Sequence, residues 1–445
     1  MEVSVNPNDN NIFFEFNTYE EFTKERLKLN YEQTLKLWYS RPADLSNIDN
    51  QFIRRRTPRQ QRAVLRKVKL FYFYSARLCN DILNMPLVED ESFYEIYQSL
   101  VRSTVGFLNK GKRYDPMINL EELFKAGRLL WTMIAIQVEF DLPVAITDSL
   151  FGYNMLYPYT DDFVDCTSVS QEAKKEFAQI LHNQLLIGEP NYDPKSHFDG
   201  KQSKLTDLRL SPSLQPYIDK IGKIFDMVKS IENDWTRRGE HDGVYMSLAT
   251  IHDSQIKSTL QHARPDDGYE PTMAQIEQVS ADKGGASLIA AGFLIEGRLT
   301  RAKIAYLEYL GFGMQLVDDL QDVALDMKNN HRTIFTQLIA EGQTLDAPTA
   351  RLIQYWYCSP AYNKFTDDHS GSSDAETNVT MAHYAYILMI KSCILLILEA
   401  AARLPQYYSK EFYRELSTLS PIPFNFLRRV GIENKLMGIV RNQWF

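Results

Sequence analysis

The sequence has few cysteines and no zinc-type cysteine spacing. Its four cysteines lie far apart in 445 residues, and none forms a CxxC pair. This distribution argues against a zinc site or a disulfide framework and favours a reducing, intracellular compartment. The first residues also lack the basic and apolar regions of a secretion signal. We therefore expect a cytoplasmic protein.

Several motifs of common enzymes and binding proteins are also missing. The sequence contains no GxxxxGK(S/T) or GxGxxG nucleotide loop, no GxSxG motif of serine hydrolases and no HExxH motif of zinc proteases. A net charge of −8 gives no sign of nucleic-acid binding over the whole surface. These absences disfavour nucleotide-loop enzymes, serine hydrolases, zinc proteases and nucleic-acid-binding proteins.

Two segments raise the question of a membrane. Residues 384–404 are apolar over a length that could span a bilayer, but Lys391 lies in their middle. We expect a buried helix there and no stable membrane insertion. The basic run at residues 54–69 is expected to be a solvated helix start, because Thr57 and Pro58 suit an N-cap and a first helical turn. Contact of this run with phosphates or acidic lipid is the alternative.

The periodicity of the chain predicts an all-α protein. Strand signals are sparse, and long segments place apolar residues three and four positions apart. The clearest predicted helices lie within residues 65–83, 119–140, 213–235 and 300–330. We expect residues 1–110 to be an N-terminal helical segment, either an addition or the first helices of the same bundle. Residues 111–445 are expected to form the main helical domain.

The first acidic cluster follows a tyrosine-rich stretch. Its three aspartates are Asp161, Asp162 and Asp165. In a helix, Asp161 and Asp165 share one face with Tyr153 and Tyr157, because all four lie at steps of four residues. Like charges at this spacing repel, so a bound cation would relieve a cost that solvent otherwise has to offset. Pro158 predicts either a bend in this helix or the start of a new one.

The second acidic cluster ends another apolar segment. Its members are Asp318, Asp319, Asp322 and Asp326. Asp318, Asp322 and Asp326 lie at steps of four, which predicts a second acidic stripe on one helix. Grouped carboxylates suit Mg²⁺, which takes oxygen ligands and commonly shares its shell with substrate phosphates. The two clusters together indicate a metal-assisted site for a diphosphate or triphosphate.

These motifs resemble those of the class I isoprenoid synthases, which include trans-prenyltransferases and class I terpene cyclases. The letters DDFVD at 161–165 match the aspartate-rich DDxxD motif of that superfamily. The stretch GFGMQLVDDLQD at 311–322 is similar to the second prenyltransferase motif, in which Gly and Gln precede DDxxD. Read as 318–326, the same stretch follows the cyclase pattern (N/D)DxxSxxxE, with aspartates at the Ser and Glu positions.

The resemblance implies a single large helical bundle around a central apolar cavity, with 111–445 as its catalytic domain. It also implies three Mg²⁺ ions per active site, bound between the two clusters. The implied ligands are Asp161, Asp162, Asp165, Asp318, Asp319, Asp322 and Asp326. Of these, Asp161, Asp165, Asp318 and Asp322 are expected to be catalytic.

Basic side chains should line the same rim, because the departing diphosphate carries more negative charge than metal ions alone neutralise. Lys283 precedes Gly284 and Gly285, which we expect to break a helix and to free amides for an anion. The other candidate diphosphate-binding residues are Lys328, Arg332, Arg237 and Arg238. Ordinary surface roles are the alternative for each of them.

Aromatic side chains should line the cavity that receives the carbocation. A desolvated aromatic face stabilises such a cation by about 0.5–2 kcal/mol. The candidate wall residues are Tyr153, Tyr157, Phe293 and Phe312. Each of them also suits an ordinary place in a hydrophobic core.

Three functions remain open from the sequence. No arginine pair follows the first motif and no GGKR stretch is present, so a second diphosphate has no obvious site. This favours a terpene cyclase that uses one prenyl diphosphate. Gln315 before Asp318 and Asp319 favours instead a trans-prenyltransferase that adds isopentenyl diphosphate. The third is a non-catalytic helical interaction protein. A homodimer is common in the families that the chain resembles.

Overall fold

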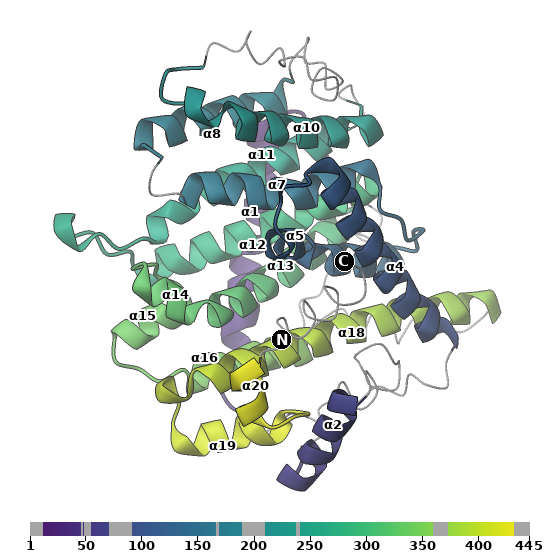
Figure 1. Cartoon of the computed structure of the whole chain (residues 1–445), viewed down its shortest axis with the longest axis vertical. Coiled ribbons are helices and arrows are strands. Elements are labelled where there is room, and N and C mark those ends of the chain that lie inside the picture. Colours follow the sequence, from purple (N-terminus) through teal and green to yellow (C-terminus); the bar gives the residue numbers. More distant parts are fainter. Residues whose placement is uncertain are drawn as a thin grey trace.

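The computed structural model describes residues 12–45, 48, 55–70, 91–165, 169–188, 210–236, 241–358 and 373–430 (Figure 1). Helices make up the regular structure of these residues, and only isolated β-bridges occur beside them. The prediction of an all-α protein is confirmed. The α-helices are α1 (Tyr19–Ser40), α2 (Pro58–Leu70), α4 (Glu91–Tyr114), α5 (Leu120–Ala126), α6 (Arg128–Glu139), α7 (Asp148–Asp165), α8 (Gln171–Leu186), α10 (Ile218–Asp234), α11 (Asp242–Ser258), α12 (Met273–Glu296), α13 (Arg301–Gln321), α14 (Val323–Lys328), α15 (Ile334–Ala340), α16 (Asp346–Tyr357), α18 (Ser373–Arg403), α19 (Lys410–Leu419) and α20 (Phe424–Val430).

The helices pack in layers around α12 and α13, which share the largest contact in the bundle. α11 packs on α12, α10 packs on α7, and α18 packs on both α6 and α13. In Figure 1, α8 and α10 lie at the top, α18 crosses the lower half, and α19 and α20 lie at the bottom. One continuous hydrophobic core joins these layers.

Local signals in the sequence fix where the central helices begin and end. The side-chain oxygen of Thr272 accepts a hydrogen bond from the backbone N–H of Gln275, whose own side chain accepts from the N–H of Thr272. This capping box satisfies two amides that the first turn of α12 leaves without partners. Gly297 ends the helix at a φ of 77°, a left-handed conformation that favours glycine. Thr300 then caps α13 by accepting from the N–H of Lys303.

α12 runs unbroken through Gly284 and Gly285, so the predicted helix break is wrong. The two glycines serve close packing instead. A Cβ atom on Gly284 would lie 2.4 Å from the carbonyl oxygen of Gly311 on α13. A Cβ atom on Gly285 would lie 1.6 Å from Oε2 of Glu308. Only glycine lets the backbones of α12 and α13 approach this closely.

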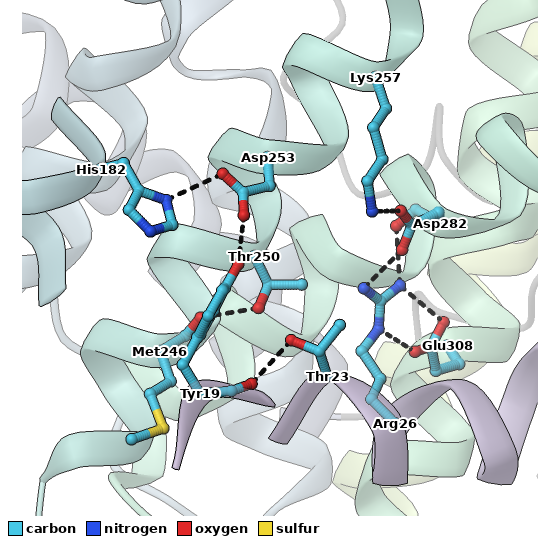
Figure 2. A network of polar contacts seen from close by, with 10 residues as sticks. All are labelled: Tyr19, Thr23, Arg26, His182, Met246, Thr250, Asp253, Lys257, Asp282 and Glu308. Atoms are coloured by element: carbon cyan, nitrogen blue, oxygen red, sulfur yellow. Dashed lines mark hydrogen bonds and ion pairs between the residues drawn. The ribbon is translucent and has the colours of Figure 1, made fainter. Parts of the chain in front are cut away.

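The N-terminal helix α1 packs within the bundle through a buried arginine (Figure 2). Arg26 is 2% exposed, and its Nη1 lies 2.7 Å from Oδ1 of Asp282 on α12. Its Nε lies 2.5 Å from Oε1 of Glu308 on α13. Burial lowers the pKa of the arginine, but the two carboxylates outweigh this effect, so the pKa lies above its usual value. Arg26 therefore links α1 to both α12 and α13, the two helices that meet at Gly284.

α18 contains the apolar segment that raised the question of a membrane span. Among the described residues, Met381–Arg403 is long and apolar enough to cross a bilayer, with a mean hydropathy of 2.0. Within the bundle, 78% of its most apolar stretch is buried. The aliphatic side chains face α6, α13 and α16, which is the packing expected of a core helix.

Candidate active site: an apolar cavity with polar helix ends at its wall

A cavity of about 670 Å³ lies between α4, α5, α6, α7, α8, α11, α12, α13 and α18. Its volume falls within the range of small-molecule binding sites. Aliphatic side chains from different helices make up most of its wall, among them Leu108, Leu156, Leu248, Leu288, Met314 and Leu396. Such a wall favours an apolar ligand with few hydrogen-bonding groups.

Several polar residues of the wall come from helix ends, and others come from helix interiors. Thr160 stands near the end of α7, and Asp318 and Gln321 stand near the end of α13. Arg128 is the first residue of α6, and Lys283 comes from the middle of α12. These positions bring cationic and anionic side chains to one otherwise apolar cavity.

Asp318 and Arg128 form an ion pair at this wall. Nη1 of Arg128 lies 3.6 Å from Oδ1 of Asp318, and both side chains are nearly half exposed. Arg128 was missed by sequence reasoning, because a single arginine after Gly127 carries no motif. The packing of α6 beside α13 brings Arg128 to Asp318, which the sequence predicted as a metal ligand.

Asp319 lies behind Asp318 and is 5% exposed. Its Oδ1 accepts a hydrogen bond of 2.7 Å from Nε2 of Gln315, and its Oδ2 accepts one of 3.3 Å from the hydroxyl of Ser280. The pKa of this carboxyl is raised to about 7, chiefly by burial; the Gln315 hydrogen bond opposes the rise, and the nearby charges of Asp326 and Asp318 add to it. A bound cation would relieve the crowding of these negative charges.

The second cluster does not form one stripe along a single helix, so that prediction is wrong. α13 ends at Gln321, and Asp322 caps the start of α14 with a φ of −94° and a ψ of 4°. The change of direction leaves Asp322 exposed and buries Asp326. Oδ1 of Asp326 lies 3.0 Å from Nδ1 of His331, and the backbone N–H of His331 donates to the carbonyl oxygen of Asp326.

The backbone of the first cluster forms the last turn of α7, which continues through Pro158 without a new helix start. Thr160 and Val164 of this turn lie four residues apart and line the cavity. The turn that carries the cluster therefore contributes to the cavity wall through these two residues. The side chains of Asp161, Asp162, Asp165 and Tyr157 lie outside the described part of the structure.

No group of three or more His, Cys, Asp or Glu side chains with metal-binding proximity occurs among the side chains that the structure describes. The side chains of the first cluster are not among them, so of the two acidic clusters this result bears only on the second. Asp318, Asp319 and Asp326 interact electrostatically at Asp319 but do not converge into a complete ligand set.

The predicted basic residues occupy different surroundings. Lys283 lines the cavity. Lys328 is exposed at the end of α14. Nε of Arg332 lies 2.5 Å from Oε1 of Glu270, so this guanidinium already has a carboxylate partner. Arg237 and Arg238 lie outside the described residues.

Of the aromatic residues predicted for the cavity wall, some line the cavity and others lie in the core. Tyr153 lines the cavity, and its hydroxyl donates a 2.9 Å hydrogen bond to the carbonyl oxygen of Ser287. Phe293 packs against Phe16 and Phe22 in the core, and neither of the two predicted phenylalanines lines the cavity. Phe312 packs instead against Trp38. The assignment of these two phenylalanines to the cavity wall is therefore wrong.

Other aromatic side chains take that place at the wall, and the sequence did not single them out. They are Phe107, Phe124 and Trp131. They come from α4, α5 and α6, which lie before the first motif in the chain. Periodicity shows that such residues are apolar, but the packing of the helices decides which of them face a cavity.

Comparison of the chain with protein-family models, with curated proteins and with solved structures gave no match.

Proposed function

We propose that this protein is a Mg²⁺-dependent class I terpene synthase. It would release diphosphate from a linear prenyl diphosphate and guide the resulting carbocation to a terpene product, which we expect to be cyclic. The proposal rests on one observation above all: Asp318 of the second motif and the helix turn that carries Asp161 both border one large apolar cavity. The isoprenoid synthase fold and the cytoplasmic location are parts of the same proposal.

The cavity suits the hydrocarbon chain of such a substrate. Each buried methylene group contributes about 0.8 kcal/mol, so a prenyl chain gains most of its affinity from apolar contact. The aliphatic wall offers this contact without requiring hydrogen bonds from the ligand. It also excludes water, which would otherwise quench a carbocation.

Asp318 at the cavity wall and the buried Asp319 behind it would suit magnesium. The raised pKa of Asp319 reflects burial beside two other carboxyl groups, an arrangement that a divalent cation stabilises. Asp318 and Asp319 would hold metal on one wall, and Asp161, Asp162 and Asp165 on the other. Asp326 is a weaker candidate, because it pairs with His331. Asp322 is exposed at the N-cap position of α14 without a side-chain capping hydrogen bond, and it stays a prediction. Bound Mg²⁺ would neutralise the diphosphate and favour its departure.

Cationic side chains of the wall would bind the diphosphate. Lys283 lines the cavity and keeps its predicted role. Arg128 joins it, because metal binding at Asp318 would compete for the carboxylate and leave the guanidinium for the anion. Arg332 is a poorer candidate than the sequence suggested, since it pairs with Glu270. Arg237, Arg238 and Lys328 stay predictions.

Aromatic side chains of the wall would stabilise the carbocation after the diphosphate leaves. Tyr153 presents its ring from α7, with the hydroxyl fixed to Ser287. Phe107, Phe124 and Trp131 provide further faces. Each desolvated face contributes about 0.5–2 kcal/mol toward a nearby cation.

Product analysis tests this proposal. Purified protein would be incubated with Mg²⁺ and with geranyl, farnesyl or geranylgeranyl diphosphate, with and without isopentenyl diphosphate. Hydrocarbon or alcohol products from a single substrate support the synthase. Longer prenyl diphosphates formed only with isopentenyl diphosphate would assign a prenyltransferase instead. Failure to consume any of these substrates would leave the interaction protein as the better account.

A matched pair of variants makes the result specific. Asp318→Asn alters the carboxylate at the cavity wall and should abolish turnover. Asp266→Asn removes an exposed carboxylate from the turn at residues 265–267 and should leave turnover unchanged.

A further inference from the structure

Helix α2 is attached to the bundle at its N-terminal end. The hydroxyl of Thr57 accepts from the N–H of Gln60, and the Gln60 side chain accepts from the N–H of Thr57, which forms a capping box. Nε2 of Gln61 donates to the carbonyl oxygens of Ser417, in the last turn of α19, and of Ser420, which directly follows this helix. The expected helix start at Thr57 and Pro58 is confirmed, and its orientation is fixed by α19.

The two sides of α2 differ in chemistry. Gln61, Val64 and Leu65 face inward, where Gln61 is 6% exposed and the two aliphatic side chains pack against the core. Arg59, Arg62 and Arg66 are exposed. The arginines are separated by three and four residues, so they share one face of the helix. We call these three residues the α2 arginine stripe.

None of the acidic side chains that the structure describes pairs with the stripe. Residues 51–80 contain no aspartate or glutamate. No carboxylate in the described part of the chain forms an ion pair with any arginine of the stripe, and Nε of Arg62 donates only to the backbone oxygen of Pro58. Like charges at these spacings destabilise a helix by a few tenths of a kcal/mol. An external anion would remove this repulsion.

The chain as a whole is acidic, with a net charge of −8, so the stripe is a local exception. In Figure 1, α2 lies at the lower edge of the molecule, beside α19. A helix at an edge, with its cations on one side, can approach a flat anionic surface without bringing the acidic bulk of the protein onto it. A long nucleic acid would extend beyond α2 along a protein of net charge −8, which electrostatic repulsion disfavours.

We propose that α2 docks the protein reversibly on an anionic lipid bilayer through the arginine stripe. The apolar side of α2 packs against the bundle, so electrostatic attraction between the arginines and the anionic headgroups would hold the helix at such a surface. α18 stays in the core of the bundle, so docking requires no inserted helix. The inference does not depend on the proposed terpene synthase activity.

Vesicle co-sedimentation tests this inference with the full chain. The probes are vesicles of phosphatidylcholine alone and vesicles of phosphatidylcholine mixed with phosphatidylserine. We expect binding to the mixed vesicles only, lost at about 1 M salt, where the screening length falls to about 3 Å. The variant Arg59→Gln/Arg62→Gln/Arg66→Gln should bind them about 100-fold more weakly, since each cation near the surface contributes about fivefold.

The control removes the same charge from elsewhere. Arg102→Gln/Arg113→Gln/Lys175→Gln changes three exposed cations of α4 and α8 and should bind the mixed vesicles as the unaltered protein does. Thermal unfolding of both triple variants checks that the fold is retained. Equal binding to both kinds of vesicle, or equal losses in the two triple variants, would overturn the proposal. So would binding of RNA through the stripe without binding of the mixed vesicles.

Discussion

The guanidinium of Arg128 lies 3.6 Å from the carboxylate of Asp318, which joins the first turn of α6 to the last turn of α13 at the cavity wall. An ion pair that is nearly half exposed contributes at most about 1 kcal/mol to stability. The pair therefore has more consequence for the charge of the cavity wall than for the fold. It brings a cation to the place where the proposed diphosphate would be released.

Arg128→Gln should separate these two roles. We expect a melting temperature close to that of the unaltered protein and a rate of diphosphate release lowered about 10²-fold or more, because one preorganised donor at a reacting group has that effect. Arg113→Gln removes an exposed arginine from α4 and should change neither quantity. A normal rate for Arg128→Gln would show that Arg128 takes no part in the reaction.

Gly311 should tolerate no side chain. A Cβ atom there would lie 2.2 Å from the carbonyl oxygen of Gly284, so Gly311→Ala forces α12 and α13 apart and should lower the free energy of unfolding by about 1–3 kcal/mol. Gly106 on α4 is the matched control, because its nearest neighbour would be 3.9 Å from the new Cβ. Gly106→Ala should stabilise the protein by about 0.5–1 kcal/mol. Urea denaturation measures both, and equal effects would contradict the close contact.

Arg26→Met should be strongly destabilising. It removes the cation that lies between Asp282 and Glu308 and leaves two buried carboxylates with reduced compensation. Breaking a buried pair in this way costs about 3–5 kcal/mol. Lys24→Met, on the exposed side of the same helix, should change stability by less than about 1 kcal/mol. A small effect of Arg26→Met in urea denaturation would mean that α1 is not an integral part of the bundle.

Glu139 should make stability depend on pH. Burial raises the pKa of its carboxyl from 4.5 to about 8, although a hydrogen bond from Tyr306 lowers it. The folded protein then holds this proton more tightly than the unfolded chain. The associated stability is complete below pH 4.5 and is lost as the pH rises through about 8.

Glu139→Gln removes this titration. Between about pH 6 and about pH 9, the variant should lose less stability than the unaltered protein in urea denaturation. Glu121→Gln, which removes an exposed carboxyl from α5, should leave the pH profile unchanged. Parallel pH profiles for Glu139→Gln and the unaltered protein would contradict the assignment.

The sequence predicted those features that depend on local chemistry. Apolar periodicity predicted the all-α fold, and Thr57 with Pro58 predicted the start of α2. Asp318 was found as a candidate because carboxylates at the end of an apolar helix are unusual. Tyr153 was found in the same way, from its place on the stripe below the first cluster.

Features that depend on how helices pack were not predictable. Gly284 was expected to break α12, because the sequence alone does not reveal Gly311 against it. Phe293 and Phe312 are as apolar as Trp131, but only Trp131 lines the cavity. Arg128 became a candidate only when the structure placed α6 beside α13. In each case the deciding partner is remote in sequence.

The release of inorganic diphosphate tests the central claim most directly. Purified protein would be given farnesyl or geranylgeranyl diphosphate with Mg²⁺ or with a chelator, in parallel with Asp161→Asn and Asp318→Asn. We expect release by the unaltered protein that requires Mg²⁺ and that falls by at least about 10²-fold in both variants. Release that proceeds equally in the chelator or in both variants, or no release under any condition, would contradict the account.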